Sequence, residues 1–406
     1  MEKKEYRQLL SQRQYIRLLL ADTINRFGDS IDVIAYSWIM YEITGSASLM
    51  ALVVGLNFVP TVFLTPFAGA FVDRISKKRV MALADLLRFL FVAAIVTLYT
   101  TGLLSPALIV TFTLATSTVE AFRLPAGGAI LPQLLEKEYY TLGKAASYSF
   151  SRISELAGYM LAGGVIALLG AAGALWIDAA TFLISSAIIW SIRYQENLQG
   201  AKRTVKGVIQ DFAEGFRFIR ASRTIRTVSL MGLLINFGIM PLTVFQTPYV
   251  SDYLKMGPET LSFIKILIAG AALLPKLGKI KTPVIAVAAG VIMGAALIEM
   301  SIAQSLPSPV LKMGILTLSM VSIGFGGGLL NVVIGSSVMK AVPKEMMGRI
   351  SGFLAALMQA SMPVASFICS ALAVYFHIPH ILVFFGSLTL ICSLALYFRK
   401  KLDALS

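Results

Sequence analysis

Long apolar segments, separated by short polar links, follow one another along nearly the whole chain. They run over residues 15–41, 46–72, 79–101, 105–131, 143–169, 172–192, 227–250, 258–278, 282–304, 309–338, 346–375 and 379–398. A helix needs about 20 apolar residues to cross the hydrocarbon of a bilayer, and only helices and closed barrels satisfy their backbone groups there. The sequence therefore predicts an all-α integral membrane protein with twelve transmembrane helices surrounded by the lipid bilayer.

The charge content excludes two other classes of protein. Charged residues make up 14% of the chain and hydrophobic residues 57%, whereas soluble domains carry about 25% charged residues. A soluble globule is therefore excluded. The formal net charge of +14 comes from basic residues between the apolar segments rather than along one polar face, so we expect no nucleic-acid partner.

Basic residues concentrate in every second link. The basic links contain Arg74, Lys77, Lys78, Arg79, Arg193, Lys202, Arg203, Lys206, Arg217, Arg220, Arg223, Lys340, Lys344, Arg349, Arg399, Lys400 and Lys401. The intervening links, near residues 44, 102, 170 and 305, contain almost no Lys or Arg. Because basic links stay on the cytoplasmic side, both termini are predicted to be cytoplasmic.

A hydrophilic stretch divides the segments into two sets of six. We expect an N-terminal six-helix bundle over residues 1–192, a cytoplasmic linker over 193–226 and a C-terminal six-helix bundle over 227–406. Residues 208–220 are amphipathic at helical spacing, which predicts a helix at the inner membrane interface.

Residues that commonly bind metals or carry catalysis are few. Cys369 and Cys392 lie in late apolar segments without metal-ligand spacing, and His377 and His380 flank Pro379 in a short link. There is no nucleophile–base arrangement and no length left for a soluble catalytic domain. We expect no metal, no cofactor and no enzymatic activity.

The first apolar segment contains a polar stripe. Asp22, Asn25, Asp29, Asp32 and Tyr36 follow helical spacing, so they share one face of the helix. Arg26 lies one turn from both Asp22 and Asp29 and is expected to neutralise either of them. Ionisable groups at this depth cost about 2.5–3.5 kcal/mol on insertion scales and normally face a cavity or a partner. We expect the stripe to face the bundle interior.

Two further segments add charges to this half. Glu120 and Arg123 in the fourth segment, and Arg152 and Glu155 in the fifth, are spaced three residues apart and are able to pair along their helices or across to each other. The candidate proton carriers are Asp29, Asp32, Glu120 and Glu155. The alternative is that these pairs only hold the bundle together.

Other charged groups have different expected roles. Asp85 and Arg88 lie near a basic cytoplasmic link and are expected to form a structural latch. Asp178 and Glu299 lie nearer the outer face and are expected to be caps or interface contacts.

Neutral polar groups dominate the second half. The candidate cavity-lining residues of both halves are Asn25, Tyr36, Asn57, Asn236, Gln246, Asn331 and Gln359. A glycine-rich run at residues 324–328 precedes Asn331 and favours close packing or bending of its helix.

Residues 69–79 carry a resemblance to a known family. Gly69 is followed four residues later by Asp73 and Arg74 and then by the pair Lys77 and Lys78. This pattern resembles the signature of the major facilitator superfamily, although Ser76 stands where the family usually has glycine. The resemblance implies two pseudo-symmetric six-helix bundles and a gate in which Asp73 contacts residues 345–349. The expected gating residues are Gly69, Asp73, Arg74, Lys77, Lys78, Asp85, Arg88 and Arg349.

Further motifs resemble the macrolide-efflux group of drug:proton antiporters. They are residues 38–46, Pro60, Pro66, residues 122–126, Pro132, and residues 177–182 and 342–350. The resemblance implies a monomer in a bacterial inner membrane that exports small amphipathic drugs such as macrolides in exchange for protons, by alternating access. Tyr159 occupies the position where antiporters often have proline. Siderophore export, lysophospholipid transport or flipping, and a non-transporting membrane sensor remain alternatives.

Overall fold

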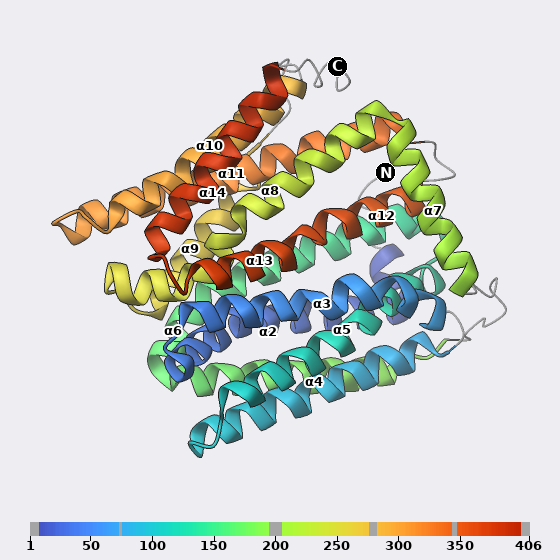
Figure 1. Cartoon of the computed structure of the whole chain (residues 1–406). Coiled ribbons are helices and arrows are strands. Elements are labelled where there is room, and N and C mark those ends of the chain that lie inside the picture. The colour runs from blue at the N-terminus through green and yellow to red at the C-terminus, as the bar shows by residue number, and fades with distance from the viewer. Residues whose placement is uncertain (1–7, 73–74, 195–204, 276–281, 343–346, 399–406) are drawn as a thin grey trace. The chain divides into compact units, whose positions relative to one another are not determined.

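The computed structural model describes residues 8–72, 75–194, 205–275, 282–342 and 347–398, and these residues form helices and no strand (Figure 1). The helices of the first part are α2 (Arg13–Thr44), α3 (Ala47–Val72), α4 (Lys77–Thr100), α5 (Pro106–Leu134), the 3₁₀ turn η1 (Lys137–Tyr139), α6 (Tyr140–Ser191) and α7 (Val205–Ala221). The second part contains α8 (Arg223–Pro248), the π-helical turn η2 (Tyr249–Leu254), α9 (Pro258–Ala271), α10 (Thr282–Ala303), α11 (Pro309–Ala341), α12 (Met347–Gln359), α13 (Ser361–Leu372) and α14 (Ile378–Phe398). The predicted all-α fold is confirmed.

Nine helices among the described residues are long and apolar enough to cross a membrane. One of them is α6, whose 52 residues include a break at Gly170, where φ is 71° and ψ is 171°. Glycine adopts this left-handed φ without the steric cost that a side chain imposes, so α6 supplies two of the predicted spans. The remaining predicted spans are α2, which contains the charged stripe, and α9, which has only 14 residues. These elements are consistent with the twelve predicted segments.

Local sequence explains where several helices begin and end. Ser76, Ser105 and Ser222 are N-caps whose side chains accept hydrogen bonds from backbone N–H groups in the first turns of α4, α5 and α8. Helix α9 ends at Ala271 rather than at the predicted residue 278. Pro275 explains the difference, because proline lacks the N–H that a helix interior requires and restricts the residue before it.

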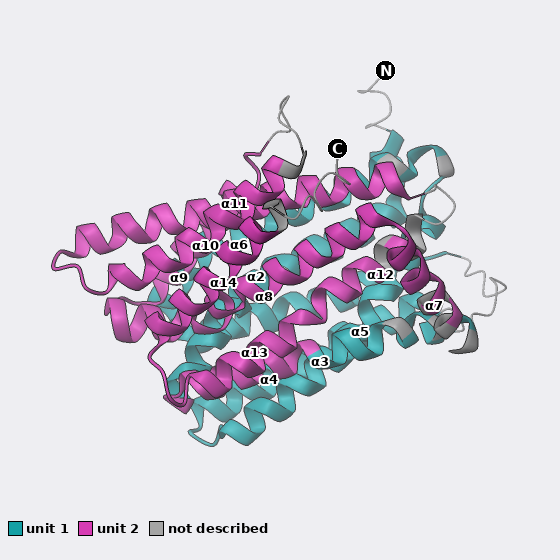
Figure 2. Cartoon of the chain, turned by 45° about the horizontal axis from the view of Figure 1, so that its top comes forward, with its two compact units in different colours: residues 1–43, 59–208 teal, residues 44–58, 209–406 magenta. Residues whose placement is uncertain are grey.

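The chain divides into two compact units (Figure 2). Unit 1 comprises residues 1–43 and 59–208, and unit 2 comprises residues 44–58 and 209–406. The first part of α3 therefore belongs to unit 2. The domain boundaries proposed from the sequence, at 192 and 226, stay predictions.

In unit 1, small residues bring α2 against both halves of α6. A Cβ added at Gly158 would lie 2.7 Å from the backbone oxygen of Phe27, and a Cβ at Gly28 would lie 2.0 Å from the Thr181 hydroxyl oxygen. Glycine permits this approach between membrane helices. Beside these contacts, α2, α4, α5 and α6 bury an apolar cluster that includes Tyr15 and Met81, both fully buried. The cluster holds the four helices whose polar side chains form the site described below.

Unit 2 uses the same type of packing. Gly324 and Gly328 of α11 face the backbone oxygens of Ile268 and Ala272, at 2.3 and 2.4 Å from the position of an added Cβ. The glycine run therefore provides close packing, one of its two predicted roles. The predicted amphipathic segment is helical in α7, where Gly215 packs on Phe353 of α12.

Candidate functional site

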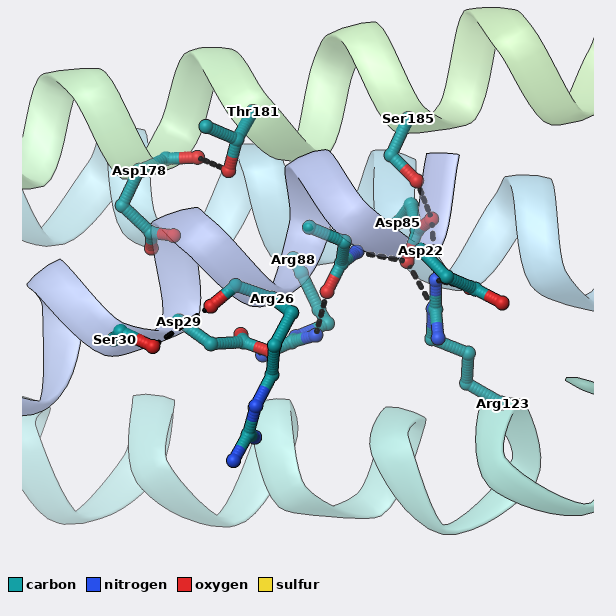
Figure 3. A network of polar contacts seen from close by, with 11 residues as sticks. Asp22, Arg26, Asp29, Ser30, Asp85, Arg88, Arg123, Asp178, Thr181 and Ser185 are labelled. Atoms are coloured by element: carbon teal, nitrogen blue, oxygen red, sulfur yellow. Dashed lines mark hydrogen bonds and ion pairs between the residues drawn. The ribbon is translucent and has the colours of Figure 1, made fainter. Parts of the chain in front are cut away.

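Polar side chains from α2, α4, α5 and the second half of α6 converge inside unit 1 (Figure 3), and Glu155 of the first half of α6 joins them through Arg26. The predicted stripe on α2 supplies Asp22, Asn25 and Asp29, and Arg26 lies on the same helix. Each of these four residues contacts a side chain of another helix. Because residues spaced three or four apart share one helical face, a single helix faces several partners along its length. We call this set, with the partners named below, the charge network.

Asp85 of α4 is the most connected member of the charge network. Its side chain is fully buried, and Arg123 Nε lies 2.5 Å from its Oδ1. Asn25 Nδ2 donates to the same oxygen at 3.1 Å, and Ser185 Oγ donates to Oδ2 at 2.7 Å. Arg123 also reaches Asp22 at 3.1 Å. Asp85 thereby joins four helical segments through one carboxylate whose charge is compensated, which a buried ion requires.

Arg88 lies one turn further along α4. Its Nη2 donates to Asp29 Oδ1 at 2.7 Å, and its guanidinium carbon lies 4.0 Å from the centroid of the Phe182 ring. The ring face attracts the cation. Arg88 Nε is buried and has no hydrogen-bond acceptor among the described residues. The arginine is therefore only partly satisfied by Asp29.

Glu155 connects α2 with α6. Arg26 Nη2 lies 2.8 Å from Glu155 Oε1, and Arg152 Nη1 lies 2.7 Å from Oε2. Arg26 thus forms its ion pair with Glu155 on the neighbouring helix rather than with Asp22 or Asp29, although Asp29 also interacts with it electrostatically. The pairing of Arg152 with Glu155 along α6 is confirmed. Tyr159, at the position where proline was expected, donates to Glu155 Oε1 at 3.4 Å.

Carboxyl groups outnumber arginines in the charge network. Its acidic members are Asp22, Asp29, Asp32, Asp85, Glu120, Glu155 and Asp178, and its arginines are Arg26, Arg88, Arg123 and Arg152. Four acids take part in the ion pairs. Asp32, Glu120 and Asp178 form no ion pair within the described part of the chain. Glu120 therefore does not pair with Arg123, one turn away on its own helix.

The excess of carboxyl groups over arginines affects which carboxyl groups are able to bind protons. Asp32 and Glu120 are half-buried and Asp178 is fully buried. All three interact electrostatically with Arg88, whose charge is already opposed by Asp29. Three additional carboxylates without counter-ions at bilayer depth are costly, and such groups normally neutralise. The arrangement is suited to binding and releasing protons.

Asp178 is more deeply buried than the sequence predicts. The sequence predicts a cap or an interface contact, whereas its side chain is fully buried and both carboxylate oxygens have no hydrogen-bond partner among the described residues. Sequence reasoning did not include it in the network. A signal was present, because Asp178, Thr181 and Ser185 form a polar stripe at helical spacing in an otherwise apolar segment.

The predicted gating residues divide into two groups. Asp85 and Arg88 belong to the charge network, which gives them partners that the expected latch did not include. Gly69 faces Pro125, Lys77 is buried, and Lys78 Nζ lies 5.8 Å from the centroid of the Trp190 ring. Asp73 and Arg74, the residues 345 and 346, and the side chain of Arg349 lie outside what the structure describes, so the expected gate contact stays a prediction.

The predicted cavity-lining residues are spread over both units. Asn25 belongs to the charge network, and the Tyr36 hydroxyl lies 2.8 Å from Thr113 Oγ1. Asn236 donates to the Met358 carbonyl at 3.1 Å, and Gln246 is buried. The exposed members are Asn57, Asn331 and Gln359.

Cys369 is buried, Cys392 is half-buried, and neither forms a disulfide. The rings of His377 and His380 lie 6.2 Å apart, and the described residues contain no group of three or more His, Cys, Asp or Glu side chains able to hold a metal ion.

Residues 18–366 match the family described as Major Facilitator Superfamily. Among curated proteins, the multidrug efflux pump Tap of Mycobacterium tuberculosis (strain ATCC 25618 / H37Rv) is 26% identical over 363 residues, covering 86% of this chain and 84% of the relative. Macrolide efflux protein A of Streptococcus pyogenes is 25% identical over 364 residues, covering 86% of this chain and 87% of the relative.

Solved structures share the fold at low sequence identity. The nucleoside transporter NupG superposes with a TM-score of 0.70 at 14% identity, covering 95% of this chain and 98% of that one. A bacterial homologue of the iron transporter ferroportin superposes with a TM-score of 0.67 at 17% identity, covering 97% and 98%. These similarities concern the fold alone.

Proposed function

Because the chain belongs to the major facilitator superfamily and is thus a multi-pass membrane transporter rather than an enzyme, we propose that it exports small amphipathic molecules, such as macrolides, in exchange for protons. Relatives named as a multidrug efflux pump and a macrolide efflux protein support the direction and the substrate class.

The excess of carboxyl groups over arginines in the charge network carries the proposal of proton coupling. Asp29 and Glu155, two of the four predicted proton carriers, already have arginine partners. Asp32 and Glu120 have none within the described residues, so they are the primary carriers. Each is half-buried, which leaves a route for proton exchange with water. A proton bound there removes an uncompensated charge and thereby changes the preferred arrangement of the surrounding helices.

Export proceeds by alternating access. The substrate binds from the cytoplasm or the inner leaflet, the two halves rock about it, and proton entry returns the carrier to its starting state. The proposed working unit is a monomer. The membrane is the bacterial inner membrane, with both termini on the cytoplasmic side.

The test uses purified protein in liposomes with an imposed pH gradient and an internal pH-sensitive dye. Macrolides, lipophilic dyes, siderophores and lysophospholipids are added in turn to the wild type, to Asp32→Asn and to Glu120→Gln. Glu138→Gln is the matched control, because it makes the same carboxylate-to-amide change at an exposed position in η1. We expect a macrolide or dye to drive proton flux in the wild type and the control, and proton flux at the level of empty liposomes in at least one network variant.

Three results would contradict the proposal. Substrate movement without proton flux in the wild type makes the protein a facilitator or a flippase. Transport of only a siderophore or a lysophospholipid assigns one of the alternative substrates. Binding of a compound without movement in sealed liposomes indicates a sensor.

A further inference from the structure

We propose that Asp178 is a further proton-binding residue, and that it is the alternative counter-ion for Arg88. In the arrangement described, Asp178 carries a proton and Arg88 pairs with Asp29. In the other arrangement, Asp29 carries the proton and Arg88 pairs with an ionised Asp178. The proposal rests on proton coupling as proposed above and identifies a residue that was not among its carriers.

The surroundings of Asp178 favour a neutral carboxyl group. Its two carboxylate oxygens are buried and accept no hydrogen bond from any described residue, and no dashed line reaches them in Figure 3. A buried, unpaired carboxylate is costly, and the group binds a proton instead. Asp178 differs in this from Asp85, which is equally buried and accepts hydrogen bonds from three side chains.

Thr181 and Gly28 form a notch around the carboxyl group. An added Cβ at Gly28 would lie 2.5 Å from Asp178 Oδ1 and 2.0 Å from Thr181 Oγ1, so both atoms occupy the space that the absent side chain leaves. The Thr181 hydroxyl donates its proton to the backbone carbonyl of Asp178 at 2.7 Å. In this orientation the Thr181 hydroxyl does not donate to the carboxylate, and the notch suits the protonated form. A turn of the same hydroxyl towards the carboxylate would stabilise the ionised form that the other arrangement requires.

Arg88 is placed for the exchange. It binds Asp29 through Nη2, while its buried Nε has no acceptor among the described residues. Its guanidinium group stacks on Phe182, which follows Asp178 by one helical turn. Arg88 Nε and the two carboxylate oxygens of Asp178, which have no hydrogen-bond partner among the described residues, thus lie in the same region of unit 1. When the O–H bond of Asp178 breaks and one forms on Asp29, Arg88 changes its partner and the total charge is conserved.

Other charged groups face this pair. Asp29 and Asp32 of α2 repel a negative charge on Asp178, and Arg88 of α4 attracts it. Glu120 of α5 acts on Arg88. A proton moving onto Asp29 removes one repulsion and releases Arg88, so protonation of Asp29 and ionisation of Asp178 favour each other.

The first experiment is infrared spectroscopy of the purified protein at neutral pH. The wild type minus Asp178→Asn difference spectrum is expected to show the stretching band of a protonated carboxyl group, and Glu138→Gln is expected to give no such difference. Absence of the band in the difference for Asp178→Asn overturns the proposal. This result does not depend on transport.

A second spectrum tests the exchange of partners. Asp29→Asn removes the carboxylate that Arg88 binds, so Arg88 is expected to turn to Asp178 and the band assigned to Asp178 is expected to disappear. A structural role for Asp178 predicts no such change. Persistence of the band in a folded Asp29→Asn protein overturns the role of Asp178 as alternative counter-ion.

Transport assays in liposomes give the third readout. Asp178→Asn mimics the protonated form, so exchange of labelled against unlabelled substrate is expected to continue while uphill transport driven by a pH gradient falls to that of empty liposomes. Gradient-driven transport at the wild-type rate overturns the proposal. If the wild type itself moves no protons with any substrate, the proposed function fails, and the two spectra still decide whether Asp178 is protonated and coupled to Arg88.

Discussion

Two buried aspartates of unit 1 show how environment assigns different chemistry to one residue type. Asp85 receives hydrogen bonds from Arg123, Asn25 and Ser185, whereas Asp178 receives none from a described side chain. An ionised carboxylate is stabilised in the first position by a directly bound arginine and two neutral donors, whereas in the second position Arg88 acts without forming an ion pair and is already bound to Asp29. Asp85 is thus suited to a permanent charge and Asp178 to a proton that is bound and released.

The stabilities of the two amide variants are expected to differ. Asp85→Asn removes the main counter-ion of Arg123, and breaking one partner of a buried ion pair costs about 3–5 kcal/mol. Asp178→Asn replaces a neutral carboxyl by a neutral amide of the same shape, and we expect a change below about 1 kcal/mol. Thermal or denaturant unfolding of the purified proteins in detergent measures both. Equal destabilisation by the two substitutions would indicate that Asp178 is ionised in the folded protein.

Sequence reasoning predicted the polar stripe on α2 but not its partners. The 3.6-residue period determines which residues share a face, so Asp22, Asn25 and Asp29 were found together. The ion pairs depend on how each neighbouring helix is rotated, and spacing along one helix carries no such information. Arg26 therefore pairs with Glu155 of α6 instead of with an aspartate of its own helix.

At the scale of helices, glycine determines how closely α2 approaches α6. The Cβ position at Gly158 lies 2.7 Å from a backbone oxygen, which is unable to move without shifting α2. Gly164, less than two turns further along the same helix, has no atom within 4 Å of its Cβ position. The two glycines thus form a matched pair, one in a helix contact and one outside it.

We expect opposite effects from alanine at these positions. Gly158→Ala should lower the free energy of unfolding by about 1–3 kcal/mol, the usual cost of overpacking. Gly164→Ala should raise it by about 0.5–1 kcal/mol, because alanine loses less backbone entropy in a helix. Unfolding of both variants in the same detergent compares them. A stable Gly158→Ala protein would contradict the close approach of α2 and α6.

Ion pairs also contribute to the contact between α2 and α6. Glu155 accepts from Arg26 across the two helices and from Arg152 along α6, but both arginine side chains are more than one-third exposed. Water screens such pairs. We therefore expect Glu155→Gln to cost about 1 kcal/mol or less, well below Asp85→Asn, in the same unfolding assay. A loss as large as that of Asp85→Asn would show that the pair is shielded from water.

Helix positions were predictable from hydropathy, but their irregularities were only partly so. Predicted segments agree with the helices to within a few residues over most of the chain, because apolar runs and capping residues both mark the ends. Pro275 lies within the predicted segment 258–278, and α9 ends four residues before it. The π-helical turn at Tyr249–Leu254 had no recognised signal, since it follows Pro248 without a polar interruption.

For the whole molecule, the distribution of basic residues carries the information on orientation. Helix α4 offers a direct comparison, because Lys77, Lys78 and Arg79 lie at its start and no Lys or Arg lies near its end at Thr100. Basic links remain in the cytoplasm, so the start of α4 is expected inside the cell and its end outside. With alternating spans, this orientation places both termini in the cytoplasm.

Single cysteines at the two ends of α4 test this orientation. In a background with Cys369→Ala and Cys392→Ala, we expect a membrane-impermeant thiol reagent added to intact cells to label Thr101→Cys and not Arg79→Cys, both of which replace exposed residues. After the membrane is permeabilised, both should react, which shows that Arg79→Cys is accessible from the inside. Labelling of Arg79→Cys in intact cells with protection of Thr101→Cys would invert the topology. Substrate and protons would then reach the charge network from the opposite ends of the helices, but exchange would still couple proton entry to export, because an exchanger moves the two in opposite directions in either orientation.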